Sequence, residues 1–254
     1  MANWCENRIA IYAKTKEGIQ ELKNLYMRIR GLGTDYHGIP EKDMGYTTEK
    51  SVRDEKTSEI ITKKETEKAV NNWYGLLLVA HGVKIADIND CRGFIEDEIE
   101  WCDSPEPHIY LRTETAWDPK EHILDTLVSD FYKNLDYVMT AEECGMGIYI
   151  NTDVDAIFFP ERYYLEWDMC GWGGDSDYLE SDEELSRTMR RIIKEVQEKF
   201  PEYKSKFMDK IEKEGVLAMT EDDAYEERDA IEKYLSSKEN GDYEYFSIHK
   251  FESC

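Results

Sequence analysis

The fold is constrained most by a change of hydrophobic period near the N-terminus. Residues Glu6 to Ala13 alternate, with Ile9 and Ile11 on one side and polar or small residues between them. A period of two predicts a strand with one buried face. Residues Ile19 to Ile29 then carry apolar side chains at helical spacing and stop before Gly31, which allows a left-handed turn. A strand followed by an amphipathic helix is the first half of a β-α-β unit.

Strand-like and helix-like segments continue to alternate up to about residue 168. Strands are expected at four segments: Val83–Ile88, His108–Thr113, Leu135–Ala141 and Gly147–Asn151, the last two joined as a hairpin. Helices are expected over residues 65–81 and from Asp118, the predicted N-cap, with Pro119 at the first helical position. Residues 34–64 lack a sustained period, which predicts an insertion or a long mobile loop. The whole pattern predicts an α+β sandwich, with helices on one face of a mostly antiparallel sheet.

Residues 169–254 have a different character. Glycine and aspartate punctuate the start of this region at 171–177, and an amphipathic helix follows from Glu183 to Lys199. Weaker helical patterns cover 203–214 and 222–235, and residues 243–251 alternate as a final strand. We therefore predict a core over residues 1–168 and an acidic, mainly helical extension over residues 169–254.

The chain carries 56 acidic and 32 basic residues, which gives a formal net charge of −24. Proteins bind nucleic acid and anionic lipid through Lys and Arg side chains that displace counterions, and a negative field repels both. We therefore expect no direct binding to nucleic acid or to membranes, unless the fold gathers a local basic patch. The charge fits either a basic protein partner or a surface that keeps the protein in solution.

The cysteines and the N-terminal residues bear on the compartment. The six cysteines include no Cys-x-x-Cys pair, and a chain of 254 residues does not need disulfides to fold. Residues 1–15 have no basic start, continuous apolar stretch or cleavage site, so they do not form a secretory signal. The longest apolar run, Gly75 to Ala80, is far too short to span a bilayer. These features predict reduced thiols in a cytoplasmic protein.

The stretch from Asn3 to Asn7 contains Cys5, whose thiol would be reactive only beside a base or a second thiol. Neither stands near it in the sequence, so a buried cysteine is expected. Trp4 and Cys5 should then anchor the chain end against the fold as the first strand begins. We expect the amides of Asn3 and Asn7 to bond to the backbone.

Four short stretches within residues 1–152 are distinctive: Asn3-Trp4-Cys5-Glu6-Asn7-Arg8, Asn72-Trp73-Tyr74 followed by His81-Gly82-Val83-Lys84, Thr115-Ala116-Trp117-Asp118-Pro119, and Glu143-Cys144-Gly145 with Gly147. They resemble the YubB/Api-type family of uncharacterised plasmid- and phage-borne proteins. His81, Val83 and Ile85 stand where that family has Trp, Thr and Trp, so an aromatic ligand surface there would be lost or altered. The resemblance implies a ferredoxin-like fold and a home on mobile genetic elements, and it implies no catalytic residues.

Six side chains are candidates for a binding site: Trp73, His81, Trp117, Glu143, Asp175 and Asp177. The histidines at 81, 108 and 122 lie in no metal-binding or nucleophile-base spacing. The aspartates at 175 and 177, with the acidic residues after them, do not match the calcium-binding EF-hand pattern. The glycine run at 171–174 lacks the lysine of a phosphate-binding loop. No metal and no cofactor are therefore expected.

These observations predict a non-enzymatic interaction or regulatory protein of a mobile genetic element, which binds another protein. In one version, the acidic residues at 175–184 and 221–229 imitate the charge rows of DNA and bind a basic DNA-binding protein. One alternative is an enzyme in a cleft between core and extension, using Glu143, His81 or Asp175. Another is a homodimer formed through an exposed sheet face.

Overall fold

The computed structural model describes the following residues: 3–32, 45–53, 60–68, 72–96, 99–103, 106–143, 145–168, 175–214, 219–237 and 245–252. The chain divides into two compact units, Met1–Asp153 (unit 1) and Val154–Cys254 (unit 2). Each unit combines antiparallel sheet with helices, which confirms the predicted α+β class. None of the helices in these segments has both the length and the apolar character needed to cross a membrane.

The main sheet of unit 1 is built around β1 (Trp4–Ala13), which pairs on both sides. The strand order is β4-β6-β1-β7-β8, with β5 also paired to β6, and all these pairings are antiparallel. The other strands have these bounds: β4 Gly93–Ile95, β5 Glu100–Cys102, β6 His108–Ala116, β7 Leu135–Glu143 and β8 Ile148–Asn151. The strands expected at β1, β6, β7 and β8 are confirmed, whereas β4 and β5 are too short to show a period.

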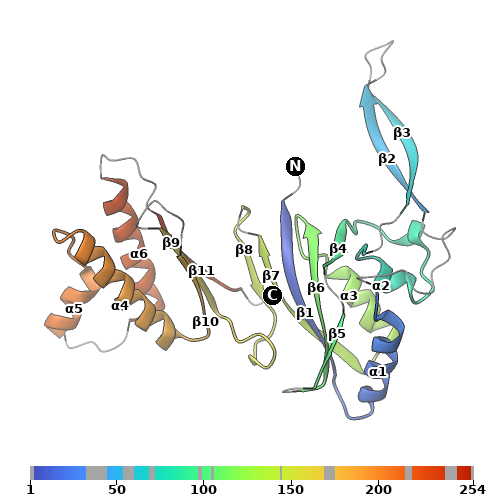
Figure 1. The fold of residues 1–254 in the computed structure, drawn as a ribbon, viewed down its shortest axis with the longest axis horizontal. Coiled ribbons are helices and arrows are strands. Elements are labelled where there is room, and N and C mark those ends of the chain that lie inside the picture. The colour runs from blue at the N-terminus through green and yellow to red at the C-terminus, as the bar shows by residue number, and fades with distance from the viewer. Residues whose placement is uncertain are drawn as a thin grey trace. The chain divides into compact units, whose positions relative to one another are not determined.

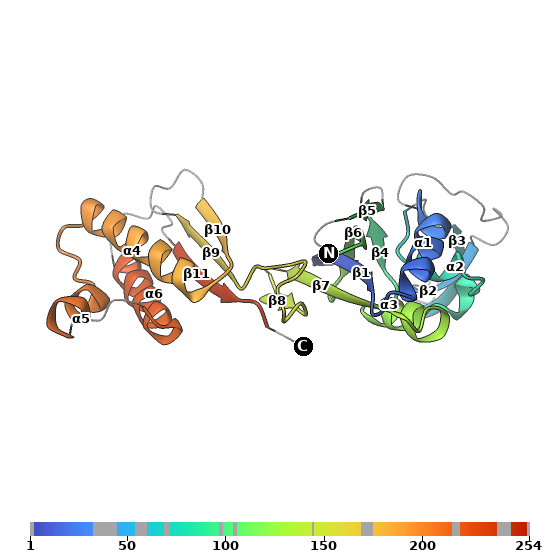
Figure 2. The same cartoon turned by 90° about the horizontal axis from the view of Figure 1, so that it is seen from below.

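Helices cover one face of this sheet (Figures 1 and 2). They are α1 (Gly18–Ile29), α2 (Leu76–Val79) and α3 (His122–Thr126). Ile9 and Ile11 of β1 are fully buried and belong to the same core as Leu22 and Leu25 of α1. Each such side chain stabilises the unit by about 2 kcal/mol relative to an exposed one. The expected pairing of a first strand with an amphipathic helix is therefore confirmed.

The segment expected to be a long loop contains a hairpin. β2 (Gly45–Arg53) and β3 (Ile60–Lys68) pair antiparallel, from Gly45 opposite Lys68 to Arg53 opposite Ile60. The loop prediction is wrong for these strands, because a strand with polar residues on both sides loses the period of two but keeps its ladder of backbone hydrogen bonds. The remaining residues of the expected loop, 34–44 and 54–59, lie outside the described segments.

Two further elements between β3 and β4 differ from the prediction. The helix expected over residues 65–81 is reduced to α2, because β3 takes its first residues and Trp73 forms a bridge with Phe94 of β4. The strand expected at Val83–Ile88 is instead a 3-10 helix, Ile85–Asp87, with only the first of its side chains buried. In a single 3-10 turn one side chain is buried and its neighbours are exposed. Over so few residues this pattern resembles the alternation of a strand, which explains the error.

The helix expected from Asp118 begins later, at His122, so the N-cap prediction is wrong. Lys120 has φ 56°, a left-handed conformation that cannot continue a right-handed helix. Asp118 Oδ1 accepts a hydrogen bond from Lys120 N at 3.0 Å and so braces a turn instead of capping α3. After Thr126 the chain continues as a π-helical turn, Leu127–Phe131.

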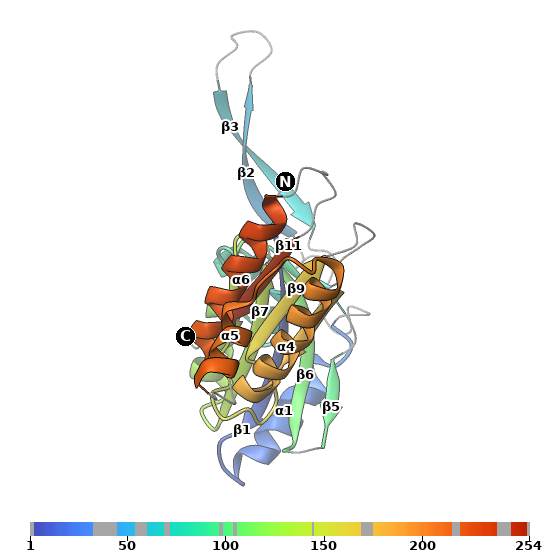
Figure 3. The ribbon, with the colours of Figure 1, turned by 90° about the vertical axis from the view of Figure 1, so that its left-hand side faces the viewer.

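Unit 2 has a three-stranded antiparallel sheet in the order β10-β9-β11, with helices on one face (Figures 1 and 3). The strands are β9 (Tyr163–Asp168), β10 (Asp175–Leu179) and β11 (Tyr245–Lys250), and the helices are α4 (Asp182–Lys199), α5 (Lys206–Glu214) and α6 (Glu221–Ser236). Among the described residues, β9 pairs only with strands of unit 2. Its residues therefore belong to unit 2, although the predicted first region extended to residue 168. The glycine run at 171–174 lies outside the described residues.

Polar side chains cap two of these helices. Ser181 Oγ accepts a hydrogen bond from Glu184 N at 3.3 Å at the start of α4. At the start of α6, Asp223 N donates to Thr220 Oγ1 at 3.2 Å and Thr220 N donates to Asp223 Oδ2 at 3.1 Å. Caps of this kind contribute about 1 kcal/mol each. Acidic residues in both first turns also interact favourably with the helix dipoles.

Glu227 of α6 is buried, with 1% of its surface exposed. Its Oε1 accepts the hydroxyl of Tyr203 at 2.8 Å, and its Oε2 accepts the N–H of Phe207 at 3.1 Å. Glu227 is one of the acidic residues at 221–229 that were expected to imitate the charge rows of DNA, and for this buried residue that expectation is wrong. Glu227 joins α6 to α5 and to the residues before it.

We predict that Glu227→Ala lowers the free energy of unfolding by about 3 kcal/mol, because it leaves two buried donors without an acceptor. The matched control is Glu226→Ala, which removes the neighbouring exposed carboxylate and should change stability by less than about 0.5 kcal/mol. Urea unfolding of the full chain measures both. Equal effects of the two substitutions would contradict the assigned role.

Candidate functional site

Trp73, Glu143 and the segments 3–8 and 115–119 lie at one end of the unit 1 sheet. Trp4 begins β1 and pairs with Ala116 at the end of β6. The N–H of Trp117 donates to the carbonyl of Asn3 at 3.0 Å. Trp73 is bridged to Phe94 of β4, the neighbour of β6. Residues far apart in the sequence therefore form one continuous patch of structure.

Four residues at this end of the sheet are called the aromatic end: Trp4, Arg92, Phe94 and Trp117. The rings of Trp4 and Phe94 have centroids 5.5 Å apart, and the guanidinium of Arg92 lies 5.3 Å from the centroid of Trp4. Trp117 is 47% exposed, which is unusual for so large an apolar side chain. Exposed Trp and Arg side chains are enriched among residues that dominate protein–protein binding.

The turns that precede β4 and follow β6 contain three residues with strained backbone conformations. Asp90, Trp117 and Lys120 have φ values of 45°, 77° and 56°, in the left-handed region that residues other than glycine avoid. Each such conformation costs roughly 1–2 kcal/mol and persists only where surrounding contacts enforce it. The fold therefore holds Trp117 in a conformation that an isolated turn would not adopt.

An ion-paired lysine supplies these contacts. The side chain of Lys120 is only 3% exposed, and its Nζ donates to Asp118 Oδ2 at 2.8 Å and to Asp90 Oδ2 at 3.1 Å. Burial by itself lowers the pKa of Lys120, but the hydrogen bonds that Nζ donates to Asp118 and Asp90 outweigh this effect and hold the pKa above its ordinary value. The ammonium is thus charged at neutral pH and ties the two turns together.

A buried polar network connects these turns to β1. Asn7, 1% exposed, donates from Nδ2 to the backbone carbonyls of Cys5 and Thr113, as the sequence analysis expected of its amide. The same nitrogen donates to Thr115 Oγ1 at 2.9 Å, and that hydroxyl donates to the carbonyl of Asp118 at 2.6 Å. The position of the strained turn therefore depends on side chains inside the sheet.

The thiol of Cys5 belongs to this buried network. It is fully buried and donates to Asn7 Oδ1 at 3.3 Å. Burial, with the nearby carboxylates of Glu143 and Asp118, raises the pKa of Cys5 to about 12. The thiol stays protonated at neutral pH, so it packs as a small apolar group and is not a nucleophile. Cys91 and Cys102 are also free thiols, and the cysteines at 144, 170 and 254 lie outside the described residues.

Glu143 ends β7 at the hairpin between β7 and β8, at the end of the sheet where β1 begins. It is 7% exposed, its Oε1 accepts Gly145 N at 3.1 Å, and its Oε2 accepts Met146 N. A Cβ at Gly145 would lie 2.9 Å from Glu143 Oε1 and 3.2 Å from Asn3 Nδ2, so a side chain there would require Glu143 or Asn3 to shift. Glu143 therefore braces a turn.

Trp73 and His81 are also held by hydrogen bonds. Trp73 is 9% exposed, and its Nε1 donates to the carbonyl of Cys91 at 2.6 Å. His81 Nδ1 lies 2.8 Å from the carbonyl of Leu77, so this nitrogen carries the proton, and Nε2 accepts the hydroxyl of Tyr132 at 2.8 Å. Tyr132 precedes β7 and Glu143 ends it, so His81 and Glu143 lie at opposite ends of that strand.

The remaining two candidates, Asp175 and Asp177, lie in β10 of unit 2. Asp175 is exposed, and Asp177 Oδ2 lies 3.5 Å from a guanidinium nitrogen of Arg191. The structure therefore gathers Trp73, Trp117 and Glu143 around one end of a sheet and places His81 and the aspartates elsewhere. In the described part of the chain, no group of His, Cys, Asp or Glu side chains is arranged to hold a metal ion.

Sequence reasoning missed Arg92, Phe94 and Lys120. Phe94 lies in a strand too short to show a period, and Arg92 directly precedes it. The positive φ of Lys120 has no signal in the sequence, because glycine or asparagine would be expected there. The sequence signal for this ion-paired turn is limited to the two aspartates at 90 and 118, which can pair with a lysine.

No family model, no curated protein and no solved structure matches the chain.

We predict that Trp4→Ala lowers the free energy of unfolding by about 2 kcal/mol, since it removes the packing of Trp4 on Phe94 at the start of β1. The matched control is Trp117→Ala, which removes an exposed indole and should leave the melting temperature nearly unchanged. Thermal unfolding of both variants makes the comparison. An unchanged melting temperature for Trp4→Ala would refute the anchoring role.

Burial lowers the pKa of His81, with the Leu77 carbonyl opposing this effect. A depressed folded-state pKa favours the neutral ring, so the stability it contributes is present above the unfolded-state pKa of about 6.5. We predict that this stability is lost as the pH falls from 7.5 through the folded-state pKa. His81→Gln should remove this part of the pH dependence in urea unfolding, whereas the exposed His122→Gln should retain it. Identical profiles for both variants would disprove the assignment.

Proposed function

We propose that this chain is a non-enzymatic interaction or regulatory protein, which binds a partner protein through the aromatic end of unit 1. The observation that carries the proposal is the exposed Trp117, which has φ 77° and directly precedes the turn that the Lys120 ion pairs hold. Strain retained at a surface is a common property of binding sites. The rigid turn lowers the entropy lost when the indole is buried by a partner.

The fold that we propose for unit 1 is ferredoxin-like. The strand order β4-β6-β1-β7 and the helices after β1 and β6 support this assignment, with β8 as an added edge strand. Together with the four sequence stretches, it supports a relationship with the YubB/Api-type proteins. We extend the proposal to a cytoplasmic protein encoded on a mobile genetic element, and this step rests on the sequence alone.

The net charge of −24 supports a basic partner, such as a DNA-binding protein. DNA mimicry by the acidic residues of unit 2 has weaker support, because several of them have internal partners. Asp223 pairs with Lys210 at 2.7 Å, and Glu221 pairs with Lys250 at 2.6 Å. The hydrogen bonds of Asp223 lower its pKa. We therefore propose that the net negative charge attracts the partner at long range. The residues of the aromatic end make the direct contact.

The enzyme alternative gains no support from its three residues. The carboxylate of Glu143 accepts backbone N–H groups of its own turn, and both ring nitrogens of His81 have hydrogen-bond partners. Asp175 lies in unit 2, whereas Glu143 and His81 lie in unit 1. The interaction protein is therefore the function that the geometry supports best.

We predict that the tagged full chain captures a basic protein from the native host at low salt, identified by mass spectrometry. Trp117→Ala and Arg92→Ala should each reduce capture at least about tenfold, as loss of a central Trp or Arg commonly does. Met27→Ala, which removes an exposed side chain of α1, is the control and should capture the partner normally. High salt should slow association more than it weakens the complex, because the contact is mainly aromatic.

The opposite results would overturn the proposal. If Trp117→Ala and Arg92→Ala retain the partner, the aromatic end is not the contact. Recovery of nucleic acid in place of a protein would show that the partner is not a protein.

A further inference from the structure

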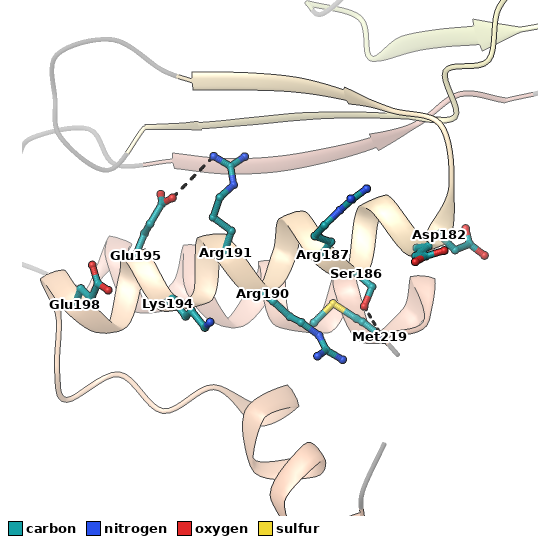
Figure 4. A pocket seen from close by; sticks show the side chains of 10 residues that line it. Asp182, Ser186, Arg187, Arg190, Arg191, Lys194, Glu195, Glu198 and Met219 are labelled. Atoms are coloured by element: carbon teal, nitrogen blue, oxygen red, sulfur yellow. Dashed lines mark hydrogen bonds and ion pairs between the residues drawn. The ribbon is translucent and has the colours of Figure 1, made fainter. Parts of the chain in front are cut away.

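Helix α4 carries a row of basic side chains that the net charge of the chain conceals. Arg187, Arg190, Arg191 and Lys194 recur at intervals of three and four residues, so their backbone positions lie on one face of the helix. They line a groove of about 890 Å³ along α4, shown in Figure 4. This is a local basic patch within a strongly acidic protein.

The buried side of α4 explains why these residues face the groove. Leu185, Met189, Ile192, Ile193 and Val196 are buried in the core of unit 2 and use the opposite surface of the helix. Arg187 and Arg191 extend toward the strands, whereas Arg190 and Lys194 extend to the other side of α4 (Figure 4). The four cations therefore spread over the width of the helix.

Two aromatic rings position the arginines. The guanidinium of Arg191 lies 5.2 Å from the ring of Trp167, and that of Arg190 lies 5.5 Å from the ring of Phe207. The planar guanidinium is attracted to the face of an aromatic ring, and this contact restricts the arginine side chain before a ligand arrives. A partner would then lose less free energy in ordering these side chains.

The ion pairs of Arg187 and Arg191 are exposed and therefore weak. Arg187 pairs with Glu184 at 3.2 Å, and Arg191 pairs with Asp177 at 3.5 Å and with Glu195 at 3.9 Å. The two arginine side chains are 72% and 49% exposed. Exposed pairs of this kind contribute at most about 1 kcal/mol each, so a better-placed carboxylate can replace them.

The order of charges along the groove limits what can bind. Asp182 and Glu183 precede the basic row, and Glu195 and Glu198 follow it. The row from Arg187 to Lys194 therefore spans about 10 Å of helix between two negative ends. A nucleic acid backbone would continue past these ends and meet carboxylates. An antiparallel second copy of α4 would place basic residues against basic residues.

We propose that the α4 groove binds a short acidic segment of a partner polypeptide, about two helical turns long. Carboxylates of that segment would pair with the four basic side chains, and its uncharged ends would pass the acidic ends of the groove. Met219, which is 3% exposed and donates its N–H to Ser186 Oγ at 3.0 Å, closes one side of the groove. The proposal concerns unit 2 alone and does not depend on the function proposed for the aromatic end.

The test uses the full chain and a fluorescent peptide with glutamates at every third and fourth position. A glutamine version of the peptide and a single-stranded DNA oligonucleotide are the comparison ligands. We expect binding of the glutamate peptide alone, weakened by salt. Arg190→Glu combined with Lys194→Glu should raise the Kd at least about tenfold, because like charges then face each other.

The matched control is Lys206→Glu combined with Lys233→Glu, which changes the net charge equally on exposed positions of α5 and α6. It should bind the peptide as the unchanged protein does. Lys194→Glu alone, at an exposed position, should give an intermediate Kd and guards against misfolding of the double variant. Circular dichroism checks that all variants are folded.

Four results would overturn the proposal. They are the absence of peptide binding at low salt, equal losses in the two double variants, equal binding of the glutamine peptide, and tighter binding of the oligonucleotide in a manner that requires Arg190 and Lys194. The last result would assign the groove to nucleic acid. None of these outcomes bears on capture of a partner by the aromatic end, so the two proposals fail separately.

Discussion

Unit 1 depends on the buried amide of Asn7. Its nitrogen lies within 2.9–3.2 Å of four acceptors: the carbonyls of Cys5 and Thr113 and the hydroxyls of Thr113 and Thr115. An amide has only two hydrogens, so the acceptors share them and any shift of β1 against β6 would leave buried groups unpaired. A buried polar group without a partner costs about 1–3 kcal/mol, which makes this network a strong determinant of register.

The same network reaches the surface. Thr115 accepts from Asn7 and donates to the carbonyl of Asp118, whose carboxylate in turn holds Lys120. The positive φ of Trp117 and Lys120 is thereby supported from inside the sheet. An exposed indole on a flexible loop would be an aggregation hazard, whereas one fixed by a core network presents a single defined surface. The core and the proposed binding surface are thus parts of one structure.

Periodicity explains which parts of the fold could be predicted. β1, α1, β6, the β7–β8 hairpin and α4 each bury one face, so their hydrophobic period marks them. β2 and β3 have no such pattern, and the turn at Lys120 is set by tertiary ion pairs that no local rule encodes. The same reason applies to the site. Trp73, Trp117 and Glu143 could be selected by pattern, but only pairing of distant strands brings them together with Arg92 and Phe94.

Net charge proved a poor guide to local chemistry. Several carboxylates in the acidic segments have structural roles in unit 2: Glu227 is buried, Asp223 accepts the N–H of the N-cap residue Thr220, and Asp182 accepts the hydroxyl of Tyr163 at 2.6 Å. Basic residues are fewer, yet helical spacing concentrates four of them in one groove of α4. A charge total determines the field felt at long range, which is screened beyond about 10 Å in ordinary salt. Recognition occurs within that distance, so the order of charges along α4 decides which partner fits there.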